Sequence, residues 1–236
     1  MQSRCTQLTL KISLIIVFLG IACLPAYAES LQSVNQKQLE TLTGKKLSAD
    51  PKDRWDQVYN QPTYIYGKSA ASFLVENYQY IPYQSSVLDL GMGEGRNAIF
   101  LAQKGYQVTG IDLSSVAVKK AKSLAQERGV KLKTVVASAL EYDFAEKSFD
   151  AIICFYFVDR NLIKKMKKWL KPQGIIIFEA YSLEQKKTQK NALEQDSDYL
   201  QEGELLQLFS DFRILKFEEP LHKNQFTSSI IVQKKN

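Results

Sequence analysis

Two aspartates and three glycines have the residue types and spacing that a small, charged ligand requires. Gly91, Gly93 and Gly95 occupy every second position after Asp89, and Asp112 ends the next hydrophobic stretch. Glycine adopts positive φ and lets the backbone approach a ligand without a Cβ in the way. The helix expected after the glycines begins with unpaired backbone N–H groups, which attract anionic groups. The pattern therefore predicts a binding turn for a nucleotide-like ligand, with two carboxylates beside it.

The glycine spacing differs from the dinucleotide-binding fingerprint G-x-G-x-x-G. Counted from Gly91, the third glycine of that fingerprint would stand where the chain has Arg96. This disfavours a nicotinamide-dependent oxidoreductase. A structural interpretation of the two acids stays open, because Asp89 could cap a turn or a helix and Asp112 could be the N-cap of the next helix.

Strand-like and helix-like segments alternate around these residues with short connections, as in βαβ units of a parallel sheet. Strands are expected at 86–90, 107–111, 132–137, 149–155 and 175–180. Helices are expected at 97–104, 114–128 and 161–170. Two further β-like runs, at 213–220 and 225–234, predict a hairpin around residues 222–224. The expected fold class is α/β, a doubly wound and mostly parallel seven-stranded sheet that ends in an antiparallel hairpin.

Segments outside these units are expected to be less regular. Asp50 and Pro51 are typical of a helix start and predict a helix that carries Trp55, Val58 and Tyr59 on one face. The aromatic stretch 62–67 is expected to be extended, and 69–80 helical. Residues 184–197 are charged and glutamine-rich, which predicts a loop without packed structure. A short amphipathic helix is expected at 202–209.

The first 28 residues have the pattern of a secretory signal peptide. Arg4 and Lys11 are their only charges, residues 12–24 are an apolar run, and residues 26–28 read Ala-Tyr-Ala, a cleavage-site pattern. The run is shorter than the roughly 20 residues of a membrane-spanning helix. We expect an exported, periplasmic or secreted chain that starts at Glu29 and keeps no stable membrane anchor. An uncleaved anchor is the alternative. The expected organisation is a signal peptide at 1–28, a polar tether at 29–48 and one domain at 49–236.

The net charge and the small numbers of histidine and cysteine residues disfavour some classes of function. The 236 residues include 31 Lys and Arg against 25 Asp and Glu, a modest excess spread along the chain. The lysines between 164 and 171 are expected to form a solvated helix face, so nucleic-acid binding is not favoured. His222 is the single histidine, and Cys154 is the single cysteine after the leader. No metal site is therefore expected, and Cys154, which stands among apolar residues, is expected to be a buried packing thiol rather than a nucleophile.

Three stretches together resemble a known family. The form D-x-G-x-G-x-G at residues 89–95 resembles the first motif of class I S-adenosylmethionine-dependent methyltransferases. The stretch IDLSSVAVKKAK resembles the second strand of that family with its acidic end, and WLKPQGIIIFEAY resembles the turn before its fifth strand. Together with the upstream WDQVYNQPTYIYG, the chain is most similar to small-molecule methyltransferases of the tellurite-resistance and thiopurine type.

The resemblance implies S-adenosylmethionine as the cofactor and a Rossmann-like sheet. Asp89 would hold the ammonium of its methionine part, the amides of the glycine turn its carboxylate, and Asp112 its ribose hydroxyls. Leu113 would lie against the adenine, and Ser138 stands where the family has an acid for the adenine amino group. The cofactor-binding residues implied in this way are Asp89, Gly91, Gly93, Gly95, Asn97, Asp112, Leu113, Ser138, Ala139 and Phe155.

The acceptor side follows from the same resemblance. Tyr66, as part of an N-terminal helical lid, and Tyr156 and Asp159, just after the fourth strand, would act around the transferred methyl group. Tyr64 is a second lid candidate, and all lid aromatics could equally be core residues. Methyl transfer needs alignment more than acid–base help, which fits a small acceptor with a soft sulfur, selenium or tellurium atom. We expect a monomer. The alternative is an exported domain that binds the cofactor with weak catalysis or none.

Overall fold

The computed structural model describes residues 44, 46–188, 196–220 and 226–236. The predicted signal peptide, its cleavage site and most of the predicted tether lie outside these residues, as does the hairpin turn at 222–224. None of the helices within the described ranges has the length and apolar composition that a membrane span requires.

Seven strands form one sheet in the order β3-β2-β1-β4-β5-β7-β6. Strands β1 to β5 pair in parallel, whereas β7 is antiparallel to both β5 and β6. The predicted fold class is confirmed. The strands are β1 Ser86–Leu90, β2 Gln107–Asp112, β3 Lys133–Val136, β4 Phe149–Phe155, β5 Leu170–Tyr181, β6 Arg213–Glu218 and β7 Thr227–Gln233.

Helices connect and cover the strands, and two of them start at the caps that the sequence predicts. The Asp50 side chain accepts a hydrogen bond from the Asp53 N–H and caps the first described helix, while Ser114 caps another through the Ala117 N–H. The α-helices are α3 Pro51–Tyr59, α4 Ser72–Asn77, α5 Arg96–Gln103, α6 Ser115–Glu127, α7 Arg160–Trp169, α8 Leu183–Thr188 and α9 Glu204–Leu208. The short 3-10 helices are η2 Tyr78–Tyr80 and η3 Asp196–Asp198.

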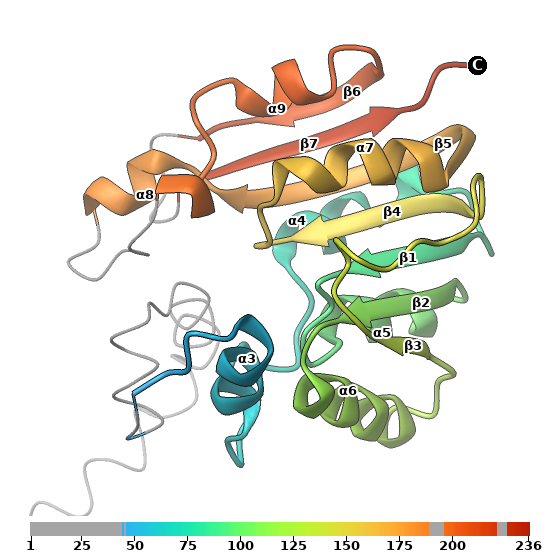
Figure 1. Ribbon diagram of the computed structural model, residues 1–236. Helices are drawn as coiled ribbons and strands as arrows, with labels where there is room; N and C mark the ends of the chain where they lie inside the picture. The colour runs from blue at the N-terminus through green and yellow to red at the C-terminus, as the bar shows by residue number, and fades with distance from the viewer. Residues whose placement is uncertain (1–43, 45, 189–195, 221–225) are drawn as a thin grey trace, which may run out of the picture. The chain divides into compact units, whose positions relative to one another are not determined.

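The apolar core lies on both faces of the sheet, because each strand of a covered parallel sheet buries both of its sides. Leu88 and Leu90 of β1 pack with the inner faces of α7 and α9, which lie in front of the sheet in Figure 1. Val87 packs on the opposite face with α4 and α5, which lie behind it (Figure 1). Asp89 alternates with Leu88 and Leu90, so its side chain is directed to the α5 side.

Two sequence predictions are wrong. The stretch 62–67 is a series of bends and turns rather than an extended segment, and the Gly67 N–H donates to the Tyr64 carbonyl to close one turn. Residues 183–188 form α8 instead of a loop, and Gln185, which is 1% exposed, accepts a hydrogen bond from the Phe226 N–H. The charged residues beside Gln185 made the stretch resemble a solvent-exposed loop, so the burial of Gln185 could not be predicted. The predicted helix at 69–80 is shorter, because it starts at Ser72 and ends in η2.

Candidate cofactor and acceptor site

The turn after β1 has the conformation that its glycines allow. Gly91, Gly93 and Gly95 have φ of 64°, 55° and 87°, in the left-handed region that favours glycine. The Met92 side chain between them lies against β2 at Gly110, where a Cβ would overlap the Met92 sulfur. The turn is therefore held to β2 by close packing, and α5 begins directly after it.

Asp89 is a buried acid at the carboxyl end of β1. It is 2% exposed, and its Oδ2 has no hydrogen-bond partner among the described residues. Burial, and then the charge of Asp112, raises the pKa of Asp89 to about 8, although a hydrogen bond from the Ala98 backbone opposes this shift. An unpaired carboxylate oxygen in such a place is what a ligand ammonium would satisfy.

Asp112, at the end of β2, faces the glycine turn. Its Oδ2 accepts a hydrogen bond from the Gly93 N–H at 2.8 Å, and its Oδ1 accepts one from the Ser114 N–H at 2.8 Å. Burial raises the pKa of this carboxyl to about 6, while these two hydrogen bonds oppose the shift. Each oxygen keeps a second lone pair, so Asp112 holds the turn in place and still offers acceptor capacity to hydroxyl groups.

Two aromatic side chains lie directly over the glycines. A Cβ at Gly91 would be 2.8 Å from the Phe157 ring, and one at Gly93 would be 2.9 Å from the Tyr59 hydroxyl. Tyr59 stacks on Trp55, with ring centroids 5.6 Å apart, and meets Tyr66 edge-on at 6.3 Å. The turn is thus covered by the chain's own aromatic residues from α3 and from the segment after β4.

A buried ion pair fastens the N-terminal segment over the turn. Glu94, inside the glycine turn, pairs with Lys120 of α6, and its Oε2 accepts a hydrogen bond from the Ile65 N–H at 2.8 Å. Lys120 in turn donates to the carbonyls of Tyr59, Gln61 and Thr63. The segment 59–65 is therefore tied to both the turn and α6.

Beside this segment, Arg96 and two tyrosines form a second cluster. The Arg96 guanidinium lies 5.5 Å from the centroid of the Tyr156 ring, whose own centroid is 5.0 Å from that of Tyr181. The Tyr156 hydroxyl donates to Glu179 at 2.8 Å, and Ser229 donates to the second oxygen of this carboxyl at 2.8 Å. The Tyr181 hydroxyl is buried without a partner in the described structure.

Backbone geometry sets the direction of Tyr156. Its φ is 57°, an uncommon value for a residue with a side chain, and its N–H donates to the Glu179 carbonyl at 2.7 Å. Glu179 holds Tyr156 in this conformation through two hydrogen bonds, because its carbonyl accepts the Tyr156 N–H and its carboxyl accepts the Tyr156 hydroxyl. This turn of the chain directs the Tyr156 ring toward Arg96.

The structure brings several predicted site residues together, namely Asp89, Asp112, the glycine turn, Tyr66 and Tyr156. Arg96 links the last two, since its Nη1 donates to the Tyr66 carbonyl at 3.4 Å. The Asn97 Oδ1 accepts the Ala71 N–H at 2.9 Å and so positions α4, and Phe155 is buried in the core. Asp159 caps α7 through the Asn161 N–H.

Three of the predicted cofactor-binding residues lie beside the carboxyl ends of β2 and β3. Leu113 follows β2 directly and is partly exposed. Ser138 and Ala139 follow β3, where the Ser138 carbonyl accepts the Glu141 and Tyr142 N–H groups in a turn. The Ser138 hydroxyl forms no hydrogen bond within the described residues, and the side chains of Leu113 and Ala139 are apolar. Their roles toward the adenine stay predictions.

Sequence reasoning missed Tyr59, Glu94, Phe157, Glu179 and Tyr181, and it used Arg96 only to reject the dinucleotide fingerprint. One signal was available, because Glu179 is an acid within the otherwise apolar stretch 175–180 of β5. The remaining residues carried no such signal, since their contacts join segments far apart in the chain.

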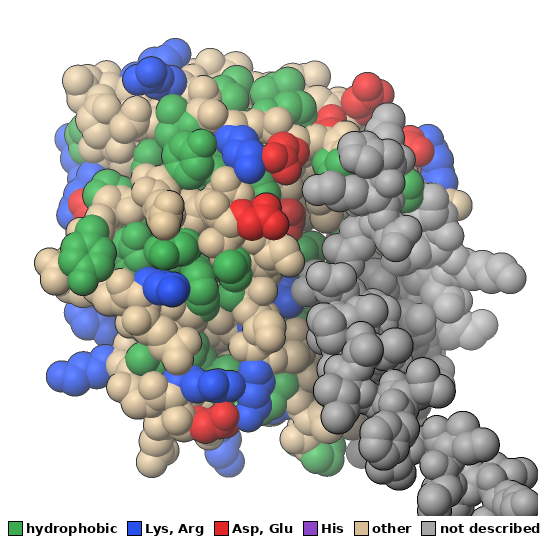
Figure 2. Space-filling model, turned by 180° about the vertical axis from the view of Figure 1, so that it is seen from behind, with side chains coloured by type: hydrophobic (Ala, Val, Ile, Leu, Met, Phe, Trp, Pro, Cys, Tyr) green, Lys and Arg blue, Asp and Glu red, His purple; other side chains and the backbone are tan. Residues whose placement is uncertain are grey.

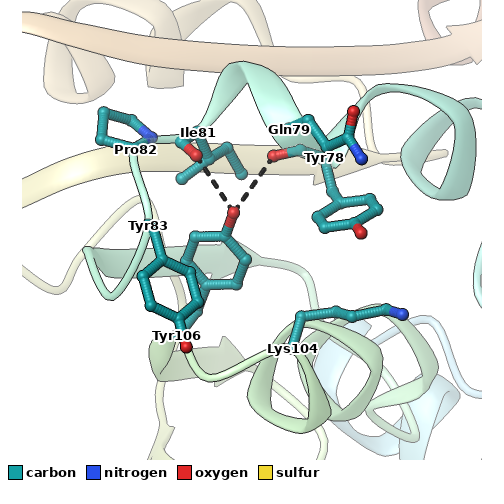
Figure 3. Close-up of a pocket in the computed structure, with 7 residues that line it drawn as sticks. All are labelled: Tyr78, Gln79, Ile81, Pro82, Tyr83, Lys104 and Tyr106. Carbon is teal, nitrogen blue, oxygen red and sulfur yellow. Dashed lines mark hydrogen bonds between the residues drawn. The ribbon is translucent and has the colours of Figure 1, made fainter.

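A separate pocket of about 330 Å³ lies at the amino-terminal ends of β1 and β2, opposite the ends that carry Asp89 and Asp112. Figure 3 shows its lining residues, which include Tyr78, Tyr83 and Lys104. The Tyr106 hydroxyl donates to the Ile81 and Tyr78 carbonyls, so its polar group is already satisfied (Figure 3). This pocket is distinct from the glycine turn.

Other sequence predictions concern residues outside the site. Cys154 is 1% exposed, and burial raises the pKa of its thiol, which confirms the packing thiol. The basic residues of α7 have partners nearby, since Lys167 pairs with Asp211 and Lys168 with Asp143. On the face that Figure 2 shows, basic side chains are scattered among hydrophobic ones rather than gathered in one patch.

The part of the chain that contains the glycine turn and strands β1 to β4 is similar to known proteins. Residues 87–174 match the model of a family described as a methyltransferase domain. This stretch is a class I methyltransferase domain. The match covers β1 with its acid, the glycine turn, β2 with Asp112, and the chain up to the turn within β5.

Curated relatives of the methyltransferase domain are similar over part of their length. A ubiquinone biosynthesis O-methyltransferase of Rickettsia conorii is 32% identical over 97 residues, which cover 39% of this chain and 33% of the relative. A carboxy-S-adenosyl-L-methionine synthase of Nautilia profundicola is 32% identical over 148 residues, 58% of this chain and 61% of the relative. The chain thus spans less than two thirds of the length of these relatives.

The solved structure of TehB from Haemophilus influenzae has the same fold, with a TM-score of 0.59 and 21% identity. The likeness covers 78% of this chain and 67% of that one.

The family implies S-adenosylmethionine as the cofactor of the methyltransferase domain. The residues present fit this molecule: Asp89 has a buried, unpaired carboxylate oxygen, the turn beside it is built of glycines, and Asp112 lies at the end of the next strand.

Proposed function

We propose that this protein transfers a methyl group from S-adenosylmethionine to a small acceptor with a soft sulfur, selenium or tellurium nucleophile, and that it does so after export from the cytoplasm. The observation that carries the cofactor assignment is the unpaired Oδ2 of Asp89, buried beside the glycine turn. Carboxylates suit this cofactor better than a phosphate cradle would, because it carries an ammonium group and a ribose diol but no phosphate.

Asp89 would pair with the cofactor ammonium, and Asp112 would accept hydrogen bonds from the ribose hydroxyls with the lone pairs that the Gly93 and Ser114 amides leave free. The remaining amides of the glycine turn and the start of α5 suit the carboxylate. When bound, the cofactor supplies a methyl group on a positively charged sulfur; the acceptor's electron pair forms the new bond to carbon, and the sulfur keeps the electron pair of the broken bond.

The side chains around the acceptor end favour a nucleophile that needs no base. Burial raises the pKa of Tyr66 to about 12, and it also raises the pKa of Tyr156 and Tyr181. A phenol with a raised pKa is a poor general base at neutral pH. Thiolates, selenides and tellurides are already deprotonated, or readily become so, and are strong nucleophiles. The chain's contribution is therefore alignment of the acceptor and exclusion of water.

Isothermal titration of the purified protein with S-adenosylhomocysteine tests the cofactor assignment. We expect one site per chain, and we expect Asp112→Ala to weaken binding about tenfold, the loss typical of hydrogen bonds to a charged group. Asp211→Ala, an exposed acid on the α7 side, serves as the matched control and should not change the affinity. An absence of binding to the wild-type chain would refute the proposed function.

Transfer of a labelled methyl group to a panel of thiols, selenols and phenols tests the acceptor class. The phenols are included because one curated relative is named as an O-methyltransferase. We expect turnover with the thiols and selenols. Exclusive methylation of the phenols would show that the acceptor class is wrong while the cofactor assignment holds.

A second candidate function is a binding domain with weak catalysis or none. The observation that favours it is the cover over the turn, where Phe157 and Tyr59 lie in the space next to Gly91 and Gly93. A protein that binds the cofactor product tightly yet methylates no member of the panel would support this candidate.

A further inference from the structure

Arg96 is a cation without a carboxylate partner at the acceptor end of the site. It forms no ion pair within the described structure, and of its five N–H donors one has a partner, the Tyr66 carbonyl at 3.4 Å. Its neighbour Glu179 is not a free counter-ion, because both oxygens of that carboxyl already accept hydrogen bonds, from Tyr156 and Ser229. A partly buried guanidinium with unused donors is suited to bind a negative group.

The Tyr181 hydroxyl lies in the same cluster and also lacks a partner. Tyr181 is 6% exposed, and its ring lies 5.0 Å from that of Tyr156, over which Arg96 is placed. The Arg96 charge acts on the pKa of six surrounding groups and lowers each one against the effect of burial; these groups are Tyr59, Tyr66, Asp89, Tyr156, Glu179 and Tyr181. Arg96 is thus the cation around which this cluster is arranged.

We propose that the acceptor binds as an anion, with its negative charge against the Arg96 guanidinium and the Tyr181 hydroxyl. This inference rests on the proposed function and specifies its substrate class. The charge lies either on the nucleophilic atom, as in a thiolate, or on an acidic group beside it, such as a carboxylate. In both cases Arg96 and Tyr181 complete their hydrogen bonds only when the acceptor is present.

Cation–π contact with Tyr156 favours this arrangement. The Tyr156 ring contacts one face of the Arg96 guanidinium. Tyr156 is itself fixed by the hydrogen bond from its hydroxyl to Glu179. Arg96 is therefore oriented before the acceptor arrives, so little conformational entropy is lost when the anion binds.

The first experiment measures binding rather than turnover. The complex with S-adenosylhomocysteine is titrated with matched probes, 3-mercaptopropionate against 3-mercaptopropanamide and benzoate against benzamide. When the charge lies on a group beside the nucleophile, we expect the acids to bind about 30-fold more tightly than the amides, as hydrogen bonds to a charged group would give. Arg96→Gln should abolish this preference, Arg96→Lys should restore part of it, and Tyr181→Phe should reduce it. Arg128→Gln, at the exposed end of α6, is the matched control that should leave the preference unchanged.

The second experiment locates the charge. If it lies on the nucleophile, methylation of neutral 2-mercaptoethanol follows an apparent thiol pKa below the solution value, and Arg96→Gln returns that pKa to the solution value. If it lies on a neighbouring group, 2-mercaptoethanol is a poor acceptor at every pH and 3-mercaptopropionate is a good one.

Several results would overturn the inference. One is equal or better binding of the amides together with methylation of 2-mercaptoethanol that follows the solution pKa of its thiol, because neither form of the anionic acceptor would then be recognised. Another is an acid preference that survives in Arg96→Gln; if that variant also loses affinity for S-adenosylhomocysteine, Arg96 belongs to the cofactor carboxylate. Binding of S-adenosylhomocysteine with neither a preference for acids nor a lowered thiol pKa refutes this inference alone. Failure of S-adenosylhomocysteine to bind refutes the proposed function, so the two outcomes are distinguishable.

Discussion

Asp89 combines burial, an unpaired oxygen and a second acid nearby, and each of these disfavours its negative charge. Its pKa of about 8 lies far above the ordinary value of 3.8, so the carboxyl is protonated at neutral pH in the cofactor-free protein. The folded state binds this proton more tightly than the unfolded chain does. The contribution of Asp89 to folding stability is therefore fully present below about pH 4 and is lost as the pH rises through about 8.

Cofactor binding should reverse this preference, because an ammonium group pairs with a carboxylate and not with a carboxylic acid. We expect binding of S-adenosylhomocysteine to release close to one proton at pH 7. We expect its affinity to rise about tenfold per pH unit between pH 6.5 and 7.5, as linkage to one proton requires. Isothermal titration in two buffers with different heats of ionisation measures the proton release directly.

Asp89→Asn is the matched control for this measurement, because it keeps the size of the side chain and removes the titration. The variant should bind more weakly and release no proton. Proton release that persists in Asp89→Asn would assign the titration to another group, with Asp112, whose pKa is about 6, as the first candidate.

Among the elements, the contacts of α6 with the N-terminal segment hold the site together. Asp56 of α3 accepts hydrogen bonds from the Ser114 hydroxyl at 2.6 Å and the Val116 N–H at 3.2 Å, at the start of α6. One turn further along α6, Lys120 pairs with Glu94 of the glycine turn, whose side chain is 3% exposed. Helix α6 thus joins α3, the segment after it and the cofactor turn.

Removal of one partner from the Glu94–Lys120 pair should loosen this region. Lys120→Met leaves a buried carboxylate without its cation and is expected to lower the free energy of unfolding by about 3 kcal/mol. Chemical denaturation measures this loss, and limited proteolysis should show faster cleavage within residues 59–65.

The double variant Glu94→Gln/Lys120→Met is the control, because it removes the unpaired charge. Its loss of stability should be clearly smaller than the sum of the two single losses. Single losses below about 0.5 kcal/mol that simply add would mean that the pair does not fasten the segment.

At the scale of the whole molecule, the prediction concerns the cellular location of the protein. The predicted signal peptide lies outside the described residues, so export stays a proposal. We expect expression of the full chain with a functional secretion pathway to give an exported protein whose intact mass corresponds to a start at Glu29. Replacement of Ala26 and Ala28 by bulky residues should block this cleavage.

A cytoplasmic protein that keeps Met1 would contradict the proposed export. An exported protein that stays in the membrane fraction with its leader intact would favour the uncleaved anchor instead. Fractionation of the cells before mass measurement separates these outcomes.

The sequence was sufficient to predict the order of the seven strands and of the helices between them up to β5, because these elements carry their own local signals, whereas α8 did not. The bounds of β1 and β4 agree with the predicted ones, and the caps at Asp50 and Ser114 form as expected. Glycine spacing and the two acids were also readable, since the chemistry of a turn after a strand depends on neighbouring residues.

Only the tertiary structure revealed the contacts of Arg96, Tyr181 and Glu179 and the cover of Phe157 and Tyr59 over the turn. Arg96 meets Tyr156 and Tyr66 through the packing of α5 against segments far away in the chain, and no periodicity encodes such a meeting. Burial likewise depends on what surrounds a residue in space, which is why the raised pKa of Asp89 and the unpaired Tyr181 hydroxyl could not be predicted from residue types alone.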